Sequence, residues 1–197
     1  LETGGSADEV AVLYRSNAQS RVIEEALLRA NIAYQIYGGQ RFFERAEIKN
    51  ALAYMRLIED RHSDPAFERV VNTPPRGIGD KSIESIRQLA RQRQQSMWTA
   101  AKAGISEGLL AARVQKTVGA FIQLMDDLAE AVAPMSLEEL AEHVIEVSGL
   151  MAFHSQERGE RGLARKENLQ ELAAACGQFA GDLVFPFEDS DRAEVSV

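Results

Sequence analysis

The sequence has few cysteine, tryptophan and histidine residues and no long apolar run, and these absences argue against disulfide-bonded and membrane-spanning proteins. Its 197 residues include one cysteine, one tryptophan and three histidines. Because a lone cysteine, Cys176, cannot form an internal disulfide, we expect a reducing compartment such as the cytosol. No apolar run approaches the roughly 18 residues that a membrane-spanning helix needs, and the polar, acidic start does not resemble a signal peptide. We therefore expect a cytoplasmic location and no membrane partner.

Side chains that could carry catalysis are few and badly spaced. His62, His143 and His154 are scattered, and none stands at a metal-ligand spacing from another histidine or from Cys176. Cys176 lies among small apolar residues, which is typical of a core position rather than of a nucleophile. No G-x-x-x-x-G-K-S/T phosphate loop is present. From these residues we expect no catalytic residue, no metal site and no bound cofactor.

Positive charge is in deficit over most of the chain but not everywhere. The 22 basic and 30 acidic residues leave a net charge of -8, which argues against binding nucleic acid through bulk charge. Between Glu68 and Arg93, however, six basic residues stand against three acidic ones. That segment is net +3 and the remainder is net -11. A phosphate-binding surface is therefore compatible with this acidic chain.

Hydrophobic patterning divides the chain near Gly38-Gly39. Two β-rich runs, 9–15 and 33–39, flank a helical pattern over 16–32, which is typical of a βαβ unit from a parallel sheet. One such unit cannot bury both faces of a sheet, so we expect the edge of a larger domain. From residue 39 onward the patterns are almost all helical. The acidic stretch from about residue 181 is expected to be a loop or a frayed tail.

Two helix starts carry recognisable signals. Ser136, with Glu139 three residues later, predicts a capping box. Asp64 is a predicted N-cap before Pro65, whose missing N–H costs little at the first helical position.

The run RGIGDKS, residues 76–82, connects two helical patterns. Gly77 and Gly79 permit positive φ and close approach of the backbone to a ligand, and successive N–H groups in such a turn can form a concave anion site. The helix expected to begin near Asp80 adds free N–H groups and the positive end of its dipole. This layout is typical of a helix-hairpin-helix motif that holds DNA phosphates without reading bases. A plain interhelical turn with a C-cap glycine has similar glycines and stays an alternative.

The side chains around these glycines favour phosphate binding over the plain turn. Lys81 and Ser82 can add a charge and a hydroxyl donor, and the flanks are basic. Ile78 is expected to anchor the hairpin in the core.

The motifs YRSN, GGQRFFERAEIK and RGIGDKS lie in a run, residues 11–86, that resembles the UvrD/Rep/PcrA-type superfamily 1 DNA helicases. The resemblance is dense over about the first ninety residues and looser beyond Arg93. It implies two RecA-like motor subdomains, 1A and 2A, with the ATP site between them and with inserted accessory subdomains 1B and 2B. Residues 1–38 then correspond to a partial RecA-like 2A segment, and residues 39–197 to a helical, 2B-like accessory subdomain. The implied fold is mainly α, with a helix-hairpin-helix-type GIG loop, preceded by a partial RecA-like βαβ edge.

The function implied by the resemblance is that of a DNA-binding accessory region of an ATP-dependent 3'-to-5' DNA helicase in DNA repair. It would contact duplex phosphates without sequence preference and regulate unwinding, in a bacterial, nucleoid-associated setting. The phosphate-loop, DEXX-type and late motifs are absent, so the chain is expected to be a fragment that is inactive as an ATPase or helicase; ATP and Mg would belong to the full-length helicase. The implied partner is DNA, at a junction of duplex and single strand. The alternative is a protein-interaction module that docks mismatch-repair and excision-repair proteins.

Site residues follow from the same motifs. In YRSN, the resemblance assigns Arg15 to a phosphate and Asn17 to a nucleotide of the single strand, although Asn17 is also a good helix cap. Lys49 and Arg56 lie seven positions apart on one helix face and could add duplex phosphate contacts. The duplex contacts carried over from RGIGDKS are Arg76, Gly77, Ile78, Gly79, Lys81 and Ser82.

Overall fold

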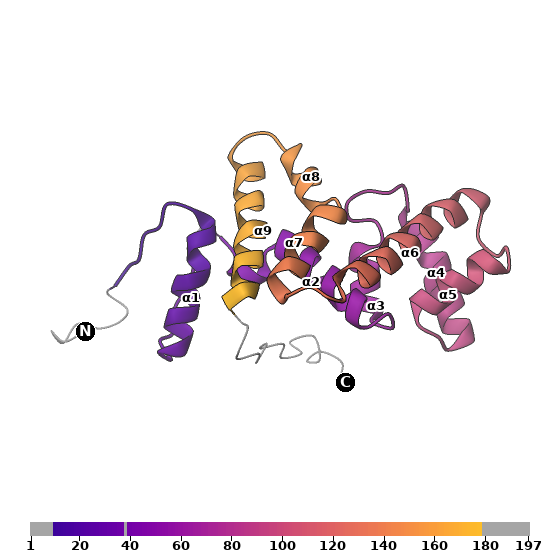
Figure 1. The fold of residues 1–197 in the computed structure, drawn as a ribbon, viewed down its shortest axis with the longest axis horizontal. Helices are drawn as coiled ribbons and strands as arrows, with labels where there is room; N and C mark the ends of the chain where they lie inside the picture. The colour runs from indigo at the N-terminus through magenta and orange to yellow at the C-terminus, as the bar shows by residue number, and fades with distance from the viewer. Residues whose placement is uncertain (1–9, 38, 179–197) are drawn as a thin grey trace, which may run out of the picture.

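The described part of the chain folds almost entirely into helices. The structure, a computed structural model, describes residues 10–37 and 39–178 (Figure 1). The predicted mainly α class is confirmed, and no strand is assigned within those residues. The expected βαβ edge is not confirmed, because neither β-rich run pairs with another strand in the described residues, and a strand forms only as part of a ladder. The predicted tail from about residue 181 lies outside the described residues.

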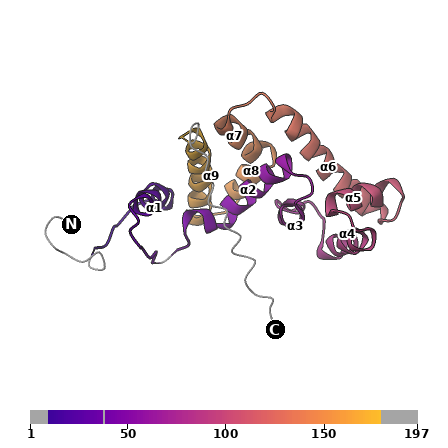
Figure 2. The ribbon, with the colours of Figure 1, turned by 90° about the horizontal axis from the view of Figure 1, so that it is seen from below.

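The first helical elements of the described chain lie at one end of the molecule (Figures 1 and 2). A 3₁₀ turn, η2 (Asn17–Gln19), leads into α1 (Ser20–Arg29). The N-cap of α1 is Gln19, without a side-chain cap, so the helix begins later than a cap at Asn17 would place it. Gln19 instead bends back, and its Oε1 accepts the N–H groups of Arg15 and Ser16.

The helical body follows the short 3₁₀ helix η3 (Phe42–Glu44) and is built around one apolar core. In Figure 1, α4 and α5 lie at the end opposite to α1, and α6 runs from them toward α7. Phe67 joins α3 to α5 and α6, because its ring packs edge-on against Trp98 at 6.4 Å and against Phe121 at 5.8 Å. The helices of the body are α2 (Ala46–Glu59), α3 (Asp64–Val70), α4 (Asp80–Arg93), α5 (Met97–Ser106), α6 (Ala112–Val132), α7 (Leu137–Val147), α8 (Leu150–Ser155) and α9 (Glu160–Gln178).

The two predicted helix starts differ in outcome. The capping box of Ser136 and Glu139 forms at the start of α7, as predicted. At α3 the N-cap is Ser63, and Asp64 is the first helical residue, so the predicted cap was one position late. The Asp64 carboxylate instead accepts the N–H of Met97 at 2.7 Å and thereby joins α3 to the start of α5.

The contact between α1 and the body is polar. Among the described residues, α1 supplies none of the apolar core. Arg21 is 1% exposed, and its Nε donates to Glu171 of α9 at 2.7 Å. The carboxylate of Glu24 accepts the N–H of Phe42 at 3.2 Å. Meanwhile Leu28, on α1, stays 62% exposed. Polar seams of this kind are usual between domains rather than within one core.

Candidate nucleic-acid interface

The loop between α3 and α4 is held in one shape by its own residues. The Oδ1 atom of Asn72 accepts the N–H groups of Arg76, at 2.8 Å, and of Ile78, at 3.1 Å. Gly77 has a φ of 77°, which favours glycine. Ile78 is fully buried and anchors the hairpin in the core, as expected. The turn is therefore fixed before any ligand arrives.

Behind the loop, α4 begins at Asp80, where the sequence placed it. Its N-cap, Gly79, has no side chain to cap the helix. The N–H groups of Ser82 and Ile83 bond the Gly79 carbonyl at 2.9 and 3.2 Å. Within the described residues, the N–H groups of Gly79, Asp80 and Lys81 have no hydrogen-bond partner. These three donors, at the positive end of the helix dipole, suit an anion.

The charged side chains of this turn are mixed in sign. Lys81 is exposed and Ser82 is half-buried, so both can reach an anion at the turn. Asp80 is also exposed in the first turn, where its carboxylate competes for the same donors. The backbone donors, together with Lys81, outweigh this single acid only if the anion comes close to the glycines.

Arg76 is turned into the protein. Its guanidinium donates to the carbonyl oxygens of Val70, Pro74 and Ser148 at 3.3, 3.0 and 2.8 Å. It also lies over the rings of Tyr54 and Phe121, 5.7 and 5.6 Å from their centroids. These contacts tie the loop to the junction of α7 and α8. They give the guanidinium a positioning role, while a phosphate contact from the same group stays a prediction.

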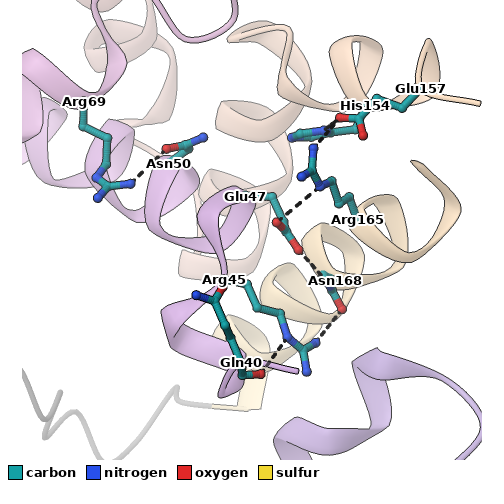
Figure 3. Close-up of polar contacts among 9 residues, drawn as sticks. All are labelled: Gln40, Arg45, Glu47, Asn50, Arg69, His154, Glu157, Arg165 and Asn168. Atoms are coloured by element: carbon teal, nitrogen blue, oxygen red, sulfur yellow. Dashed lines mark hydrogen bonds and ion pairs between the residues drawn. The ribbon is translucent and has the colours of Figure 1, made fainter. Parts of the chain in front are cut away.

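Lys49 and Arg56 are both exposed on α2. This helix is tied to the loop region by Tyr54, whose hydroxyl donates to the Thr73 carbonyl at 2.7 Å. It is also tied to α3, because Arg69 donates to Asn50 at 3.2 Å (Figure 3). Their predicted role at a duplex stays a prediction.

The predicted single-strand residues are not brought near the loop. Arg15 is exposed and helps to line an open hollow against α1, together with Leu13, Val22 and Glu171. Asn17 lies in η2, and its side chain is outside what the structure describes. In Figures 1 and 2, α1 and α4 lie at opposite ends of the molecule. A DNA molecule that touched both groups would have to span the whole chain.

Another basic residue of the second motif, Arg45, is buried. It donates to Asn168 at 2.8 Å, and Asn168 in turn donates to Glu47 at 2.7 Å (Figure 3). Arg45 also donates to Ser20 at 2.7 Å. Arg45 is 8% exposed. It therefore joins α1, α2 and α9 from within, rather than presenting its charge to solvent.

This network continues to α8 through charged pairs. Arg165 lies 3.8 Å from Glu47 and donates to Glu157 at 2.6 Å. Nδ1 of His154 donates to the same carboxylate at 2.6 Å (Figure 3). The hydrogen bond from His154, followed by that from Arg165, lowers the pKa of Glu157. The group joins α2, α8 and α9.

Two cations near the loop were missed by the sequence reading. Arg113 and Lys116 project from the first turns of α6 into an open hollow of about 580 Å³. A Cβ atom placed on Gly77 would lie 4.0 Å from Nη2 of Arg113. Their spacing of three marks one helix face, but no sequence signal says that this face meets the loop. The hollow is lined by Arg76, Arg113, Lys116, Thr117, Ala120 and Phe121.

Other kinds of site find no support in the described residues. Across 10–37 and 39–178, no helix is long and apolar enough to cross a membrane. In the same residues, no three His, Cys, Asp or Glu side chains come together as metal ligands. Cys176 is buried, as predicted, and burial raises the pKa of its thiol to about 11.

Comparison with known proteins supports the resemblance that the three motifs carry. Residues 2–179 match the family described as the UvrD-like helicase C-terminal domain. The chain is 52% identical over 179 residues to "DNA helicase II" of Escherichia coli (strain K12), which covers 91% of the chain and 25% of that relative. The protein of the same name from Haemophilus influenzae is 51% identical, with the same coverage. "ATP-dependent DNA helicase PcrA" of Staphylococcus epidermidis is 36% identical over 170 residues, covering 86% of the chain and 23% of the relative.

The chain thus spans about a quarter of the length of the curated relatives it matches. The family match covers most of the described residues, including the loop, α4 and the helices that hold them. On these grounds the chain belongs to the UvrD/Rep/PcrA-type superfamily 1 DNA helicases, in the region described as their UvrD-like C-terminal domain.

Proposed function

We propose that this chain is the DNA-binding accessory region of an ATP-dependent 3'-to-5' DNA helicase of the repair type, and that it holds the phosphate backbone of duplex DNA at the loop before α4. The observation that carries the proposal is the set of unpartnered N–H groups at Gly79, Asp80 and Lys81, on a turn that Asn72 and Ile78 hold fixed. Backbone donors read phosphates and not bases, so binding is independent of sequence.

The other predicted contacts extend this surface. Lys81 and Ser82 would reach the same phosphate, and Lys49 and Arg56 would meet the duplex from α2. Arg15 and Asn17 would serve the single strand at the far end of the molecule. The polar seam beside α1 supports a boundary near residue 38, with a 2A-like segment before it and a 2B-like subdomain after it. A body joined through such a seam can change orientation, which is how it would regulate unwinding.

ATP hydrolysis belongs to the proposal only through the longer helicase. The described residues bring no three metal-ligating side chains together, and the proposal assigns ATP and Mg²⁺ to the full-length helicase. No step of the mechanism passes through a nucleotide in this chain. A cytoplasmic, nucleoid-associated location likewise stays a prediction.

A pair of substitutions at Gly79 tests the loop without disturbing the fold. Gly79 has φ -80° and ψ 168°, which any residue can adopt, and an added Cβ would meet nothing within 4 Å. Aspartate and asparagine are both favoured N-caps, so Gly79→Asp and Gly79→Asn should keep or raise the free energy of unfolding. As an N-cap, either side chain can accept the free N–H of Lys81, but only aspartate adds a negative charge.

The expected order of duplex affinity is wild type, then Gly79→Asn, then Gly79→Asp. Fluorescence anisotropy with a labelled duplex bearing a single-stranded tail would measure this order at several salt concentrations. Gln170→Glu adds one negative charge to an exposed position on α9 and serves as the control, with affinity close to wild type. Equal affinity for wild type and Gly79→Asp would sink the proposal, as would binding that ignores salt or prefers one sequence.

The same variants separate this function from the alternative, a module that docks repair proteins. If the chain acts mainly through protein partners, Gly79→Asp leaves that association unchanged while duplex binding is weak in every variant.

A further inference from the structure

Among the described residues, the hollow on α6 beside the loop is lined by two exposed cations and by no acidic side chain. Arg113 and Lys116 are both exposed, and none of the side chains that line the hollow is a carboxylate. Its floor includes Phe121, over which the guanidinium of Arg76 is held. A negatively charged group entering the hollow would therefore meet positive charge without losing contact to water.

The charges of these two cations are not neutralised by nearby carboxylates of the described residues. In the part of the chain that the structure describes, neither Arg113 nor Lys116 forms an ion pair. Within the same described residues, exposed cations such as Lys81 and Arg91 are also outside the ion pairs, so what distinguishes Arg113 and Lys116 is their place beside the loop. Three arginines in this half of the molecule do form ion pairs: Arg61 with Asp126, Arg87 with Glu68 and Glu84, and Arg93 with Glu107.

The position of Arg113 links the hollow to the loop. Its Nη2 atom lies 4.0 Å from the point that a Cβ of Gly77 would occupy, so the guanidinium borders the glycine turn. The hydroxyl of Thr117, the next polar group along α6, donates back to the Arg113 carbonyl at 3.2 Å. The hollow would therefore attract an anion through the charges of Arg113 and Lys116 rather than through the Thr117 hydroxyl.

We propose that Arg113 and Lys116 hold a second phosphate group of the same duplex backbone, next to the one at the N-terminus of α4. This inference rests on the proposed function of the loop. Phosphates of one strand follow one another at about 3.4 Å along the helix axis. A backbone seated against Gly79 therefore brings further phosphates along the adjoining surface, where α6 presents the two cations.

The test is the salt dependence of duplex binding by the whole chain. Each phosphate contact adds about -0.9 to the slope of log affinity against log salt. The double variant Arg113→Gln/Lys116→Gln loses the one phosphate that the two cations hold, so its slope should be shallower by about 0.9. Between 50 and 200 mM salt it should lose about 3.5-fold less affinity than wild type, having started weaker. Both side chains are exposed, so thermal unfolding should be unchanged.

A matched control removes two positive charges elsewhere. Arg158 and Arg161 are exposed near the start of α9, away from α4 in Figure 1, and Arg158→Gln/Arg161→Gln should keep the wild-type slope. If the control variant makes the salt slope as shallow as the α6 variant does, the slope depends only on net charge and the inference is overturned. Competition by millimolar inorganic phosphate at constant ionic strength would assign the hollow to a free ion and would also overturn it.

The outcomes also separate this inference from the function on which it rests. Absence of duplex binding by wild type, or equal binding by Gly79→Asp, refutes the proposed function. Loss of binding in Gly79→Asp with a wild-type slope in Arg113→Gln/Lys116→Gln refutes the α6 site alone. Loss in the first and a shallower slope in the second support both.

Discussion

Replacing Arg76 by lysine separates the two roles that this residue can have beside the loop. Lysine keeps the positive charge but lacks the planar fork of donors. In the structure that fork reaches the carbonyls of Val70, Pro74 and Ser148 at once, over two aromatic rings. A single ammonium cannot reproduce these contacts. The substitution therefore removes the tie between the loop and the α7–α8 junction while leaving the local charge intact.

The magnitude follows from the contacts that are lost. A hydrogen bond from a charged donor contributes about 1.5 to 3 kcal/mol. Arg76 is half-buried and one of its three bonds is long, at 3.3 Å, so the sum must be discounted. We expect Arg76→Lys to lower the free energy of unfolding by about 3 kcal/mol. For a chain of this size that corresponds to a fall in Tm of about 6 to 12 °C.

Urea denaturation followed by circular dichroism would measure the loss, with an unchanged m value showing that the folded state stays compact. Arg91→Lys, at an exposed position on α4, is the control and should leave stability unchanged. For Arg76→Lys, duplex affinity should fall because the loop is no longer held, with the salt slope preserved because the charge remains. Wild-type stability and wild-type duplex affinity in Arg76→Lys would refute the positioning role.

Two further predictions concern titratable groups. Burial, followed by the negative charge of Glu138, raises the pKa of Cys176 to about 11, so only about 0.1% of the thiol is ionised at pH 8. Alkylation of the native protein should accordingly be no faster than unfolding, whereas rapid labelling without denaturant would contradict the buried position. Glu157, with a folded pKa below its unfolded value near 4.3, contributes stability that is present above that pH and is lost as the pH falls through the folded pKa. In Glu157→Gln the free energy of unfolding should be lower at pH 7 and should decline less steeply below about pH 4.3, and identical pH profiles in urea titrations would show that the pairs with His154 and Arg165 add nothing.

Local features of the sequence predicted much of the helical architecture. Hydrophobic spacing indicated the helices, and the capping box at Ser136 and the start of α4 near Asp80 were placed correctly. Ile78, the apolar residue between the two glycines, was expected to anchor the hairpin in the core, and it is fully buried. These features depend on residues within one or two turns of each other, so the sequence contains all of the relevant interactions.

The roles of the arginines could not be obtained in this way. Sequence grouped Arg76 with the DNA contacts, and Arg45 lies in the motif GGQRFFERAEIK. The structure shows the guanidinium of Arg76 donating to the carbonyl of Ser148, and that of Arg45 donating to the side chain of Asn168. Both partners are distant in the sequence, so the partnership exists only once the helices have packed. The β-rich runs are not confirmed as strands for a related reason, since a strand requires a neighbour that the described residues do not contain.

The sequence by itself determined the helical class, the family, and the loop with its free helix N-terminus, because turn chemistry, periodicity and motifs are local properties of the chain. Tertiary structure alone decided which positive charges remain available to an anion. It buried Arg45, committed Arg76 to carbonyl groups, and brought Arg113 and Lys116 of α6 to the edge of the loop. The physical reason is that a side chain's charge acts through its distance to other groups, and packing sets that distance.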